Sequence, residues 1–297
     1  MTELAASFEL GVPVPIPRLG FGAMHLPGRR NGPGVDRATA VAVARRAVEL
    51  GARHIATAAF YSAGTSRAND ILREALRPYP SDVTIATKVG PLRRPDGTMY
   101  GQAAPGQLRP AVAQNLRDLG VDVLDLVYLR VGRLAAGRGE PLGDRFAALA
   151  ALREEGLIRH LGVSNVTPAQ LAEARSIAPV AAVQNRFSVL DQADAALVDE
   201  CAAADIAFMP FFALGGSHAP VAGEGLEQVA RRHGATVFQV AIAWGLARSP
   251  AIVQIPGTSS LAHLGENMAA ADLARRSPGT GEGSSPPAVS NPPQSPI

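Results

Sequence analysis

Tyr61, Lys88 and Arg130 are the side chains of this chain best suited to acid–base chemistry. Lys88 is the only lysine, although Lys and Arg together number 28, and it stands near the end of the apolar segment 83–90. Arginine stays protonated, whereas burial shifts the pKa of a lysine and lets it tune a neighbouring group. A tyrosine beside an ammonium can give a proton to a carbonyl oxygen, because the cation favours the phenolate. Two simpler interpretations stay open at this point. Lys88 could be a lysine retained by chance in an arginine-rich sequence, and Tyr61 could be an aromatic side chain at the rim of the barrel without a catalytic role.

Another group of side chains stands where strands are expected to end and could hold a ligand. Ser164, Asn165 and Gln184 could exchange hydrogen bonds with an amide, and Phe211 could stack on a planar ring or belong to the core. For Ser164 and Asn165 the pattern favours a simpler role, capping of the helix that follows. The turn 256–260 runs into a helix and offers hydroxyls and backbone N–H groups to a phosphate.

Composition narrows the class of protein. The 297 residues, of which 47% are hydrophobic, suit a large α/β domain, and a net charge of +2 without a basic run between aromatics argues against nucleic acid. Cys201 is the only cysteine, which excludes an intrachain disulfide, and the six histidines show no metal-binding spacing. His54 is expected to be a core histidine with satisfied hydrogen bonds. Without a signal-peptide pattern or an apolar run of membrane-span length, we expect a cytoplasmic protein with no membrane partner.

The elements that must position these residues alternate between strands and helices. Strands are predicted at 19–24, 54–58, 83–90, 123–129, 158–163, 180–184, 206–212 and 252–255. Helices are predicted at 35–50, 68–76, 105–119, 145–155, 167–177, 193–204, 225–233, 236–247 and 262–273. Eight such units favour an α/β fold of the (β/α)8 TIM-barrel type, with function at the carboxyl ends of the strands. The domain is assigned to residues 1–276, and the Pro-, Ser- and Gly-rich segment 277–297 is predicted to be a disordered tail.

Several segments, taken in order, resemble the aldo-keto reductase superfamily and, within it, its bacterial pyridoxal-reductase-like branch. They span residues 19–273 and include 19–24, 73–79, 86–88, 115–120, 162–168, 183–185, 211–212, 214–216, 255–260 and 263–267. Members of this family are (β/α)8 barrels that bind a nicotinamide dinucleotide and reduce aldehydes or ketones. The resemblance therefore implies NADPH as cofactor, with NADH as the alternative, and a small-molecule substrate. It gives no oligomeric state.

The resemblance also assigns roles to residues. It makes Tyr61 the proton donor and Lys88 its partner, and it places Arg130 where the family usually has a histidine. The cofactor-binding residues that it implies are Gly22, Ala23, Ser164, Asn165, Gln184, Phe211, Leu214, Gly216, Gly257, Thr258, Ser259, His263, Glu266 and Asn267. Within this set, residues 164, 165 and 184 would hold the nicotinamide amide and residue 211 its ring. Residues 257–263 would hold the 2′,5′-ADP end, and residues 266 and 267 the adenine.

The chain departs from the family at two acidic positions. Ala56 stands where the family has its catalytic Asp, and Ala59 at a second Asp position. Without that carboxylate, Lys88 should be a desolvated cation beside Arg130 with a lowered pKa, and carbonyl reduction should slow. The leading hypothesis is an NAD(P)H-dependent oxidoreductase with an altered acid–base site that acts on a carbonyl or imine of a specialised metabolite. Two alternatives remain: a non-redox cyclase, dehydratase or isomerase on the same barrel, and a catalytically dead nicotinamide-binding subunit.

Overall fold

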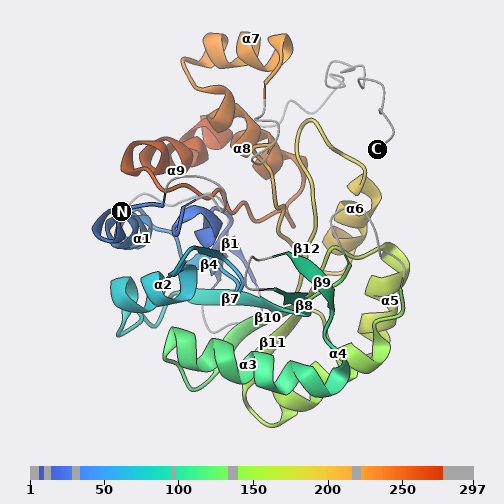
Figure 1. The fold of residues 1–297 in the computed structure, drawn as a ribbon. Coiled ribbons are helices and arrows are strands. Elements are labelled where there is room, and N and C mark those ends of the chain that lie inside the picture. Colours follow the sequence, from blue (N-terminus) through green and yellow to red (C-terminus); the bar gives the residue numbers. More distant parts are fainter. Residues whose placement is uncertain are drawn as a thin grey trace.

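A parallel sheet organises the structure, a computed structural model that describes residues 7–9, 15–28, 34–94, 98–132, 140–215 and 222–276 (Figure 1). The predicted tail 277–297 and Gly216 lie outside the described residues. In these ranges, seven parallel strands pair in the order β13-β12-β11-β10-β7-β4-β3. Their bounds are β3 Phe21–Gly22, β4 His54–Ala56, β7 Thr84–Val89, β10 Leu124–Arg130, β11 Ile158–Ser164, β12 Ala182–Gln184 and β13 Ala207–Phe208.

The segment 252–254 joins the two edges of this sheet and closes it. Ile252 pairs in parallel with Phe208, and Gln254 pairs in parallel with Leu19. The Gly20 N–H donates to the Gln254 carbonyl at 2.8 Å, and on the other side the Val253 N–H donates to the Phe208 carbonyl at 2.9 Å. The eighth predicted strand is therefore present as isolated bridges, and the predicted (β/α)8 barrel is confirmed.

Helices cover the outside of the barrel (Figure 1). Their bounds are α1 Arg37–Glu49, α2 Ala68–Leu76, α3 Pro105–Leu119, α4 Gly143–Glu154, α5 Pro168–Ile177, α6 Ala195–Ala203, α7 Glu224–His233, α8 Val237–Arg248 and α9 Leu261–Arg276. The predicted helices all occur, with α2 and α3 at their predicted bounds. Helix α1 begins later than expected because the Asp36 carboxylate accepts from the Thr39 N–H and so caps it. Gly120, with a φ of 69°, ends α3 in the left-handed conformation.

Short elements that the sequence did not predict lie at the ends of the barrel. A hairpin of β1 (Ser7–Phe8) and β2 (Ile16–Pro17) precedes the first barrel strand, and Ile16 packs with Leu126 and Val253 inside the barrel. This hairpin therefore closes the end opposite the carboxyl ends of the strands. At the carboxyl ends lie the 3-10 helix η1 (Ala23–His25) and two hairpins, β5 Ser62–Ala63 with β6 Ser66–Arg67 and β8 Pro91–Arg93 with β9 Met99–Gln102.

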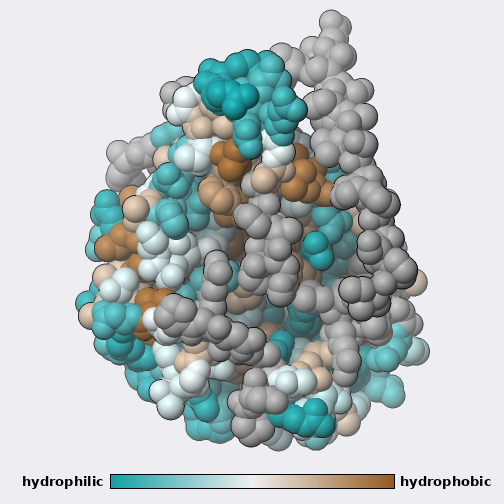
Figure 2. All heavy atoms as spheres, turned by 45° about the horizontal axis from the view of Figure 1, so that its top comes forward, coloured by the Kyte–Doolittle hydropathy of each residue, from teal (hydrophilic) through white to brown (hydrophobic). Residues whose placement is uncertain are grey.

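Helix α7 is a polar surface element. Only Ala230 of its residues is buried, and the hydrophilic cluster at the top of Figure 2 covers this helix, above a more hydrophobic area. None of the helices in the described ranges has the length and apolar character needed to cross a membrane. The same ranges hold no group of three or more His, Cys, Asp or Glu side chains arranged to bind a metal ion.

Candidate active site

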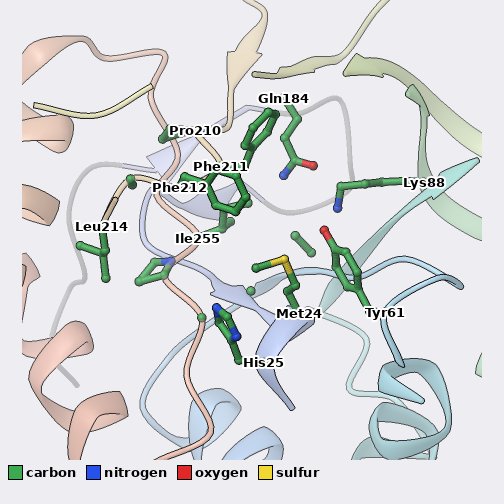
Figure 3. A pocket seen from close by; sticks show the side chains of 15 residues that line it. Met24, His25, Tyr61, Lys88, Gln184, Pro210, Phe211, Phe212, Leu214 and Ile255 are labelled. Carbon is green, nitrogen blue, oxygen red and sulfur yellow. The ribbon is translucent and has the colours of Figure 1, made fainter. Parts of the chain in front are cut away.

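A cavity opens at the carboxyl ends of the strands, where the barrel fold predicts function (Figure 3). It is lined by Gly22, Met24, His25, Ala56, Tyr61, Lys88, Gln184, Pro210, Phe211, Phe212, Ala213, Leu214, Ile255, Pro256 and Gly257. Most of these side chains are apolar, and none of the lining residues in the described part of the chain is an Asp or Glu. The cavity therefore brings the Tyr61 phenol, the Lys88 amine and the His25 imidazole into a largely apolar space.

Tyr61 and Lys88 face one another across this cavity. Lys88 lies on β7 and is only 3% exposed, and its Nζ is 5.0 Å from the centroid of the Tyr61 ring. In Figure 3 the Tyr61 hydroxyl points toward the Lys88 amine. Desolvation by burial lowers the pKa of Lys88, and the charge of Tyr61 and a hydrogen bond with its side chain act in the opposite direction. The pair has the geometry of a phenol whose proton release is assisted by a cation.

The Lys88 amine also has a backbone partner. Its Nζ donates to the Thr57 carbonyl at 2.9 Å. Ala56 is buried and lines the cavity without supplying a charge. The acceptor that the described structure gives Lys88 on the backbone is therefore a neutral carbonyl.

Arg130 ends β10 beside the cavity rather than in its lining. Its guanidinium carbon is 5.3 Å from the centroid of the Phe211 ring. Desolvation lowers the pKa of Arg130, and the charge of Tyr61 opposes that shift. Arg130 also lowers the pKa of Lys88, in the direction expected from the sequence. The structure thus groups the three residues predicted to be catalytic.

A chain of buried polar side chains lies behind Lys88. The Thr57 hydroxyl donates to Asn69 Oδ1 at 2.7 Å, and Asn69 Nδ2 donates to Asn115 Oδ1 at 3.2 Å. The Thr87 hydroxyl donates to the same Asn115 oxygen at 2.6 Å. These contacts connect β7 and the end of β4 to helices α2 and α3. Sequence reasoning missed them, although Thr and Asn at core positions are a signal for a hydrogen-bonded network.

Buried polar atoms that lack partners in the described structure lie at the ends of β11 and β12. Gln184 lines the cavity opposite Tyr61, and Ser164 pairs with Gln184 across the two strands. Ser164 and Gln184 are both 0% exposed. Within the described residues, the Ser164 hydroxyl and both amide atoms of Gln184 have no hydrogen-bond partner. Figure 3 shows the Gln184 amide pointing into the cavity from the side opposite Tyr61. A free hydroxyl and a free amide match the donors and acceptors of an amide ligand such as the nicotinamide carboxamide.

The capping role favoured for Ser164 and Asn165 is wrong. The cap of α5 is Thr167, whose side chain accepts from the Gln170 N–H in a capping box. Asn165 has a φ of 62°, and its Nδ2 donates to the Val131 carbonyl at 2.8 Å. Its side chain therefore joins the ends of neighbouring strands, which leaves Ser164 and Gln184 as the pair open to a ligand.

The residues expected near the phosphates follow the last strand. The Thr258 hydroxyl accepts from the Ser260 N–H at 3.1 Å, which shapes the turn before α9. Gly22 and Gly257 meet backbone to backbone: a Cβ on Gly257 would lie 2.4 Å from the Gly22 carbonyl oxygen. The two glycines are therefore required by the barrel seam. The remaining predicted cofactor residues, Ala23, Leu214, Ser259, His263, Glu266 and Asn267, lie on η1, on the loop after β13, on this turn and on α9, and Gly216 is not among the described residues.

Several lining residues were missed by sequence reasoning. They are Met24, His25, Pro210, Phe212, Ala213 and Ile255. Each is a near neighbour in sequence of a predicted residue, so the position of the strand ends was the available signal. The Thr57 carbonyl was also missed, because a backbone acceptor has no signature in residue type.

His54 does not have the satisfied core role expected of it. It is fully buried at the start of β4, and neither ring nitrogen has a hydrogen-bond partner among the described residues. Desolvation, with a smaller contribution from the charge of Lys88, lowers the pKa of His54 to about 3. The imidazole is therefore neutral at physiological pH, and its burial costs free energy that no hydrogen bond offsets.

Comparison with known proteins gives a consistent set of matches. The model of the aldo/keto reductase family matches residues 18–277. A pyridoxine 4-dehydrogenase of Escherichia coli (strain K12) is 48% identical over 271 residues, which cover 90% of this chain and 93% of that protein. An uncharacterised oxidoreductase of Schizosaccharomyces pombe is 36% identical over 261 residues, which cover 86% of this chain and 82% of that protein.

The fold has counterparts among solved structures. An aldo-keto reductase from Klebsiella pneumoniae, crystallised in complex with NADPH, superposes with a TM-score of 0.74 at 25% sequence identity. The match covers 93% of this chain and 95% of that chain. The similarity therefore extends over nearly the whole of both chains.

Proposed function

This chain belongs to the aldo/keto reductase family, and we propose that it is an NADPH-dependent oxidoreductase that reduces small carbonyl compounds in the cavity at the strand ends. One observation carries the proposal: the Tyr61–Lys88 pair faces Gln184, whose buried amide lacks a partner in the described residues. One wall can supply a proton, and the wall opposite can hold an amide. A carbonyl reductase requires both of these in one cavity.

The residues of the second wall fit the nicotinamide end of the cofactor. We assign Ser164 and Gln184 to its carboxamide and Phe211 to its ring, with the turn 257–259 at its phosphates. When bound, NADPH supplies the hydride that the carbonyl carbon accepts. The related structure from Klebsiella pneumoniae is a complex with NADPH, which supports NADPH as the cofactor of this chain. NADH is kept as the alternative.

The first wall supplies the proton. The Tyr61 hydroxyl donates its proton to the substrate oxygen as negative charge develops there, so that the carbonyl becomes an alcohol. The Lys88 ammonium, hydrogen-bonded to the Tyr61 side chain, stabilises the phenolate that remains. Arg130, whose charge interacts with that of Tyr61, adds a second positive charge that favours the phenolate. Apolar side chains around the pair exclude water, which strengthens these interactions.

The absent carboxylate bears on the choice of substrate. Burial favours the neutral form of Lys88, and Ala56 supplies no counter-charge. We therefore assign to this site an activated aldehyde or an imine of a specialised metabolite, because these need less help from a strong proton donor. The E. coli relative carries the name pyridoxine 4-dehydrogenase, so pyridoxal is the first aldehyde to test. The retained Tyr61–Lys88 pair argues against a dead nicotinamide-binding subunit, and no described contact favours the non-redox alternative.

The decisive experiment follows NADPH absorbance after addition of pyridoxal or of other small aldehydes. We expect substrate-dependent oxidation of NADPH by the native protein and a loss of about 100-fold or more in Tyr61→Phe, as is typical of a missing general acid. A parallel series with NADH sets the cofactor preference. If Tyr61→Phe reduces every active substrate as fast as the native protein does, the assignment of the proton donor is wrong. If no carbonyl or imine is reduced although NADPH binds, the redox function is wrong.

A further inference from the structure

The hydrogen bonds behind Lys88 form a closed ring. The ring begins at Lys88, whose Nζ donates to the Thr57 carbonyl. The Thr57 hydroxyl in turn donates to Asn69. Asn69 donates to Asn115, which also accepts from the hydroxyl of Thr87. Thr87 is covalently joined to Lys88, so the chain of contacts returns to its starting point. All five side chains are buried, with exposures from 0% to 3%.

Such a ring is costly in the place where it lies. The interface between a barrel sheet and its helices is otherwise apolar, as the neighbouring core residues Ile55, Ile85 and Ile71 illustrate. Two threonines and two asparagines at this interface lose their hydration and must be paired with good geometry. Asn115 is further fixed because its Nδ2 donates to the Ala111 carbonyl of its own helix. An apolar interface would hold β4, β7, α2 and α3 together without this cost.

The ring fixes the one atom that Lys88 uses as a backbone partner. The Thr57 N–H donates to the Ala86 carbonyl at 2.7 Å, and its hydroxyl is held by Asn69. With both groups fixed, the Thr57 carbonyl has little freedom to turn away from the lysine. The groups that face Lys88 from the surrounding elements are Tyr61, Tyr128, Arg130 and His54. None of these groups is a carboxylate.

We propose that Asn69 and Asn115 are positioning residues for Lys88, and that the ring they complete with Thr57 and Thr87 does the orienting work of the missing aspartate. The inference rests on the proposed function, because it assumes that Lys88 assists Tyr61. The ring holds the Thr57 carbonyl, and this carbonyl aims the ammonium at the Tyr61 hydroxyl and stabilises its charged form. Asn69 and Asn115 are buried and do not line the cavity, so their effect on the reaction passes through the lysine.

The test compares two substitutions at Thr57. Thr57→Val keeps the shape but removes the hydroxyl, which opens the ring, whereas Thr57→Ser keeps the hydroxyl. Gln170→Leu is the control for lost stability, because Gln170 is a buried, hydrogen-bonded side chain of α5 that lies outside the cavity lining. The measurements are kcat against pH with a reducible aldehyde, the Kd for NADPH, and the melting temperature. If Thr57→Val does not fold, Asn69→Ala takes its place, because it opens the ring at the residue that accepts from the Thr57 hydroxyl.

We expect opening of the ring to lower kcat about tenfold or more, the effect of a small misplacement of a catalytic group. The alkaline limb of the kcat profile should move to lower pH, because the carbonyl at position 57 is no longer held against Lys88 and favours its protonated form less. The Kd for NADPH should stay unchanged, and Thr57→Ser should restore the native profile. Gln170→Leu should lower the melting temperature and leave the profile unmoved.

Two results would overturn the inference. One is a Thr57→Val protein with the native kcat and pH profile. The other is a loss of kcat that Gln170→Leu reproduces at an equal drop in melting temperature, which would make the ring merely structural. Both are distinct from failure of the proposed function, in which the native protein would bind NADPH and reduce no carbonyl or imine. They are also distinct from a wrong proton donor, in which Tyr61→Phe would leave reduction intact.

Discussion

The two walls of the cavity differ in how completely their polar atoms are satisfied. Behind Lys88, on β4 and β7, the Thr57 and Thr87 hydroxyls and the lysine amine each have a partner at 2.9 Å or less. On β11 and β12, three buried atoms of Ser164 and Gln184 have none among the described residues. The first wall is organised by the protein itself, and the second is complete only when a ligand supplies partners.

This difference has an energetic meaning. A buried donor or acceptor without a partner costs about 1–3 kcal/mol. The protein bears that cost at Ser164 and Gln184, and ligand binding removes it. The Lys88 wall gains nothing comparable from a ligand. We therefore expect substitutions on the first wall to act on turnover and substitutions on the second to act on cofactor affinity.

The strongest test removes the cation of the first wall. Lys88→Met keeps most of the side chain's volume but deletes the charge beside Tyr61, so kcat for aldehyde reduction should fall about 100-fold or more. The Kd for NADPH, followed by the fluorescence of Trp244, should change little. A large loss of NADPH affinity would break the comparison, because it would show that the first wall also holds the cofactor.

The next test acts on the second wall. Gln184→Leu removes amide atoms that are unpartnered in the described structure, so it should weaken NADPH binding about tenfold, which corresponds to about 1.4 kcal/mol. The melting temperature without ligand should hold or rise, because no existing hydrogen bond is lost. Gln170→Leu is the matched control: Gln170 is buried and bonded to the Glu140 carbonyl, so its loss should destabilise. Equal destabilisation by both changes would contradict the comparison.

A third test adds a carboxylate to the first wall. Ala56→Asp should raise the pKa of Lys88, since a carboxylate within about 4–6 Å favours the ammonium. We expect a several-fold gain in NADPH-dependent reduction of pyridoxal or other simple aldehydes. The Kd for NADPH should not change, because Ser164 and Gln184 lie on other strands. Ala56→Asn, which lacks the charge, is the control. If Ala56→Asp reduces aldehydes no faster than the native protein, Tyr61 and Lys88 are not the acid–base pair.

His54 is the exception to the comparison, because it lies on β4 and yet both ring nitrogens lack partners in the described residues. Its pKa is lowered from 6.5 to about 3 in the folded protein. Below 6.5 the unfolded chain therefore binds a proton that the folded chain does not, and stability falls as the pH is lowered. One unit below that value the loss is about 1.4 kcal/mol. Urea unfolding at pH 7.5 and 5.5 should show this loss in the native protein and a smaller one in His54→Leu; identical losses in the two proteins would refute it.

The sequence predicted the helices well because their ends carry local signals. Helix α3 runs from Pro105 to Leu119, between a proline suited to the first turn and Gly120 in the left-handed conformation. The closed barrel followed from the alternation of strands and helices. The hairpin of β1 and β2 was missed, since its strands are two residues each and leave no periodic pattern.

The site was harder to predict than the fold. Lys88 was found because it is the only lysine. Gln184 and Phe211 were candidates because they stand at predicted strand ends, and the resemblance gave them their roles toward the nicotinamide. The Thr57 carbonyl has no signature in residue type, and the partners of Asn69 and Asn115 are set by how helices meet strands. The capping expected of Ser164 failed because Thr167 and Gln170, three residues apart, form the actual capping box. We expected His54 to have hydrogen-bond partners only because most buried histidines do. The contacts in the structure were needed to test this.

The barrel seam has a consequence for how the protein is made. Residues near 18–22 find their partners only at 252–257: Arg18 Nε donates to the Ile252 carbonyl at 2.9 Å, and Gly22 lies against Gly257. During synthesis the first strand leaves the ribosome long before those partners exist. Until then β3 and β13 are open sheet edges, which neighbouring chains can pair with. We therefore expect chains that end before residue 252 to aggregate more readily than the complete protein, and they also lack Gly257 of the cavity lining.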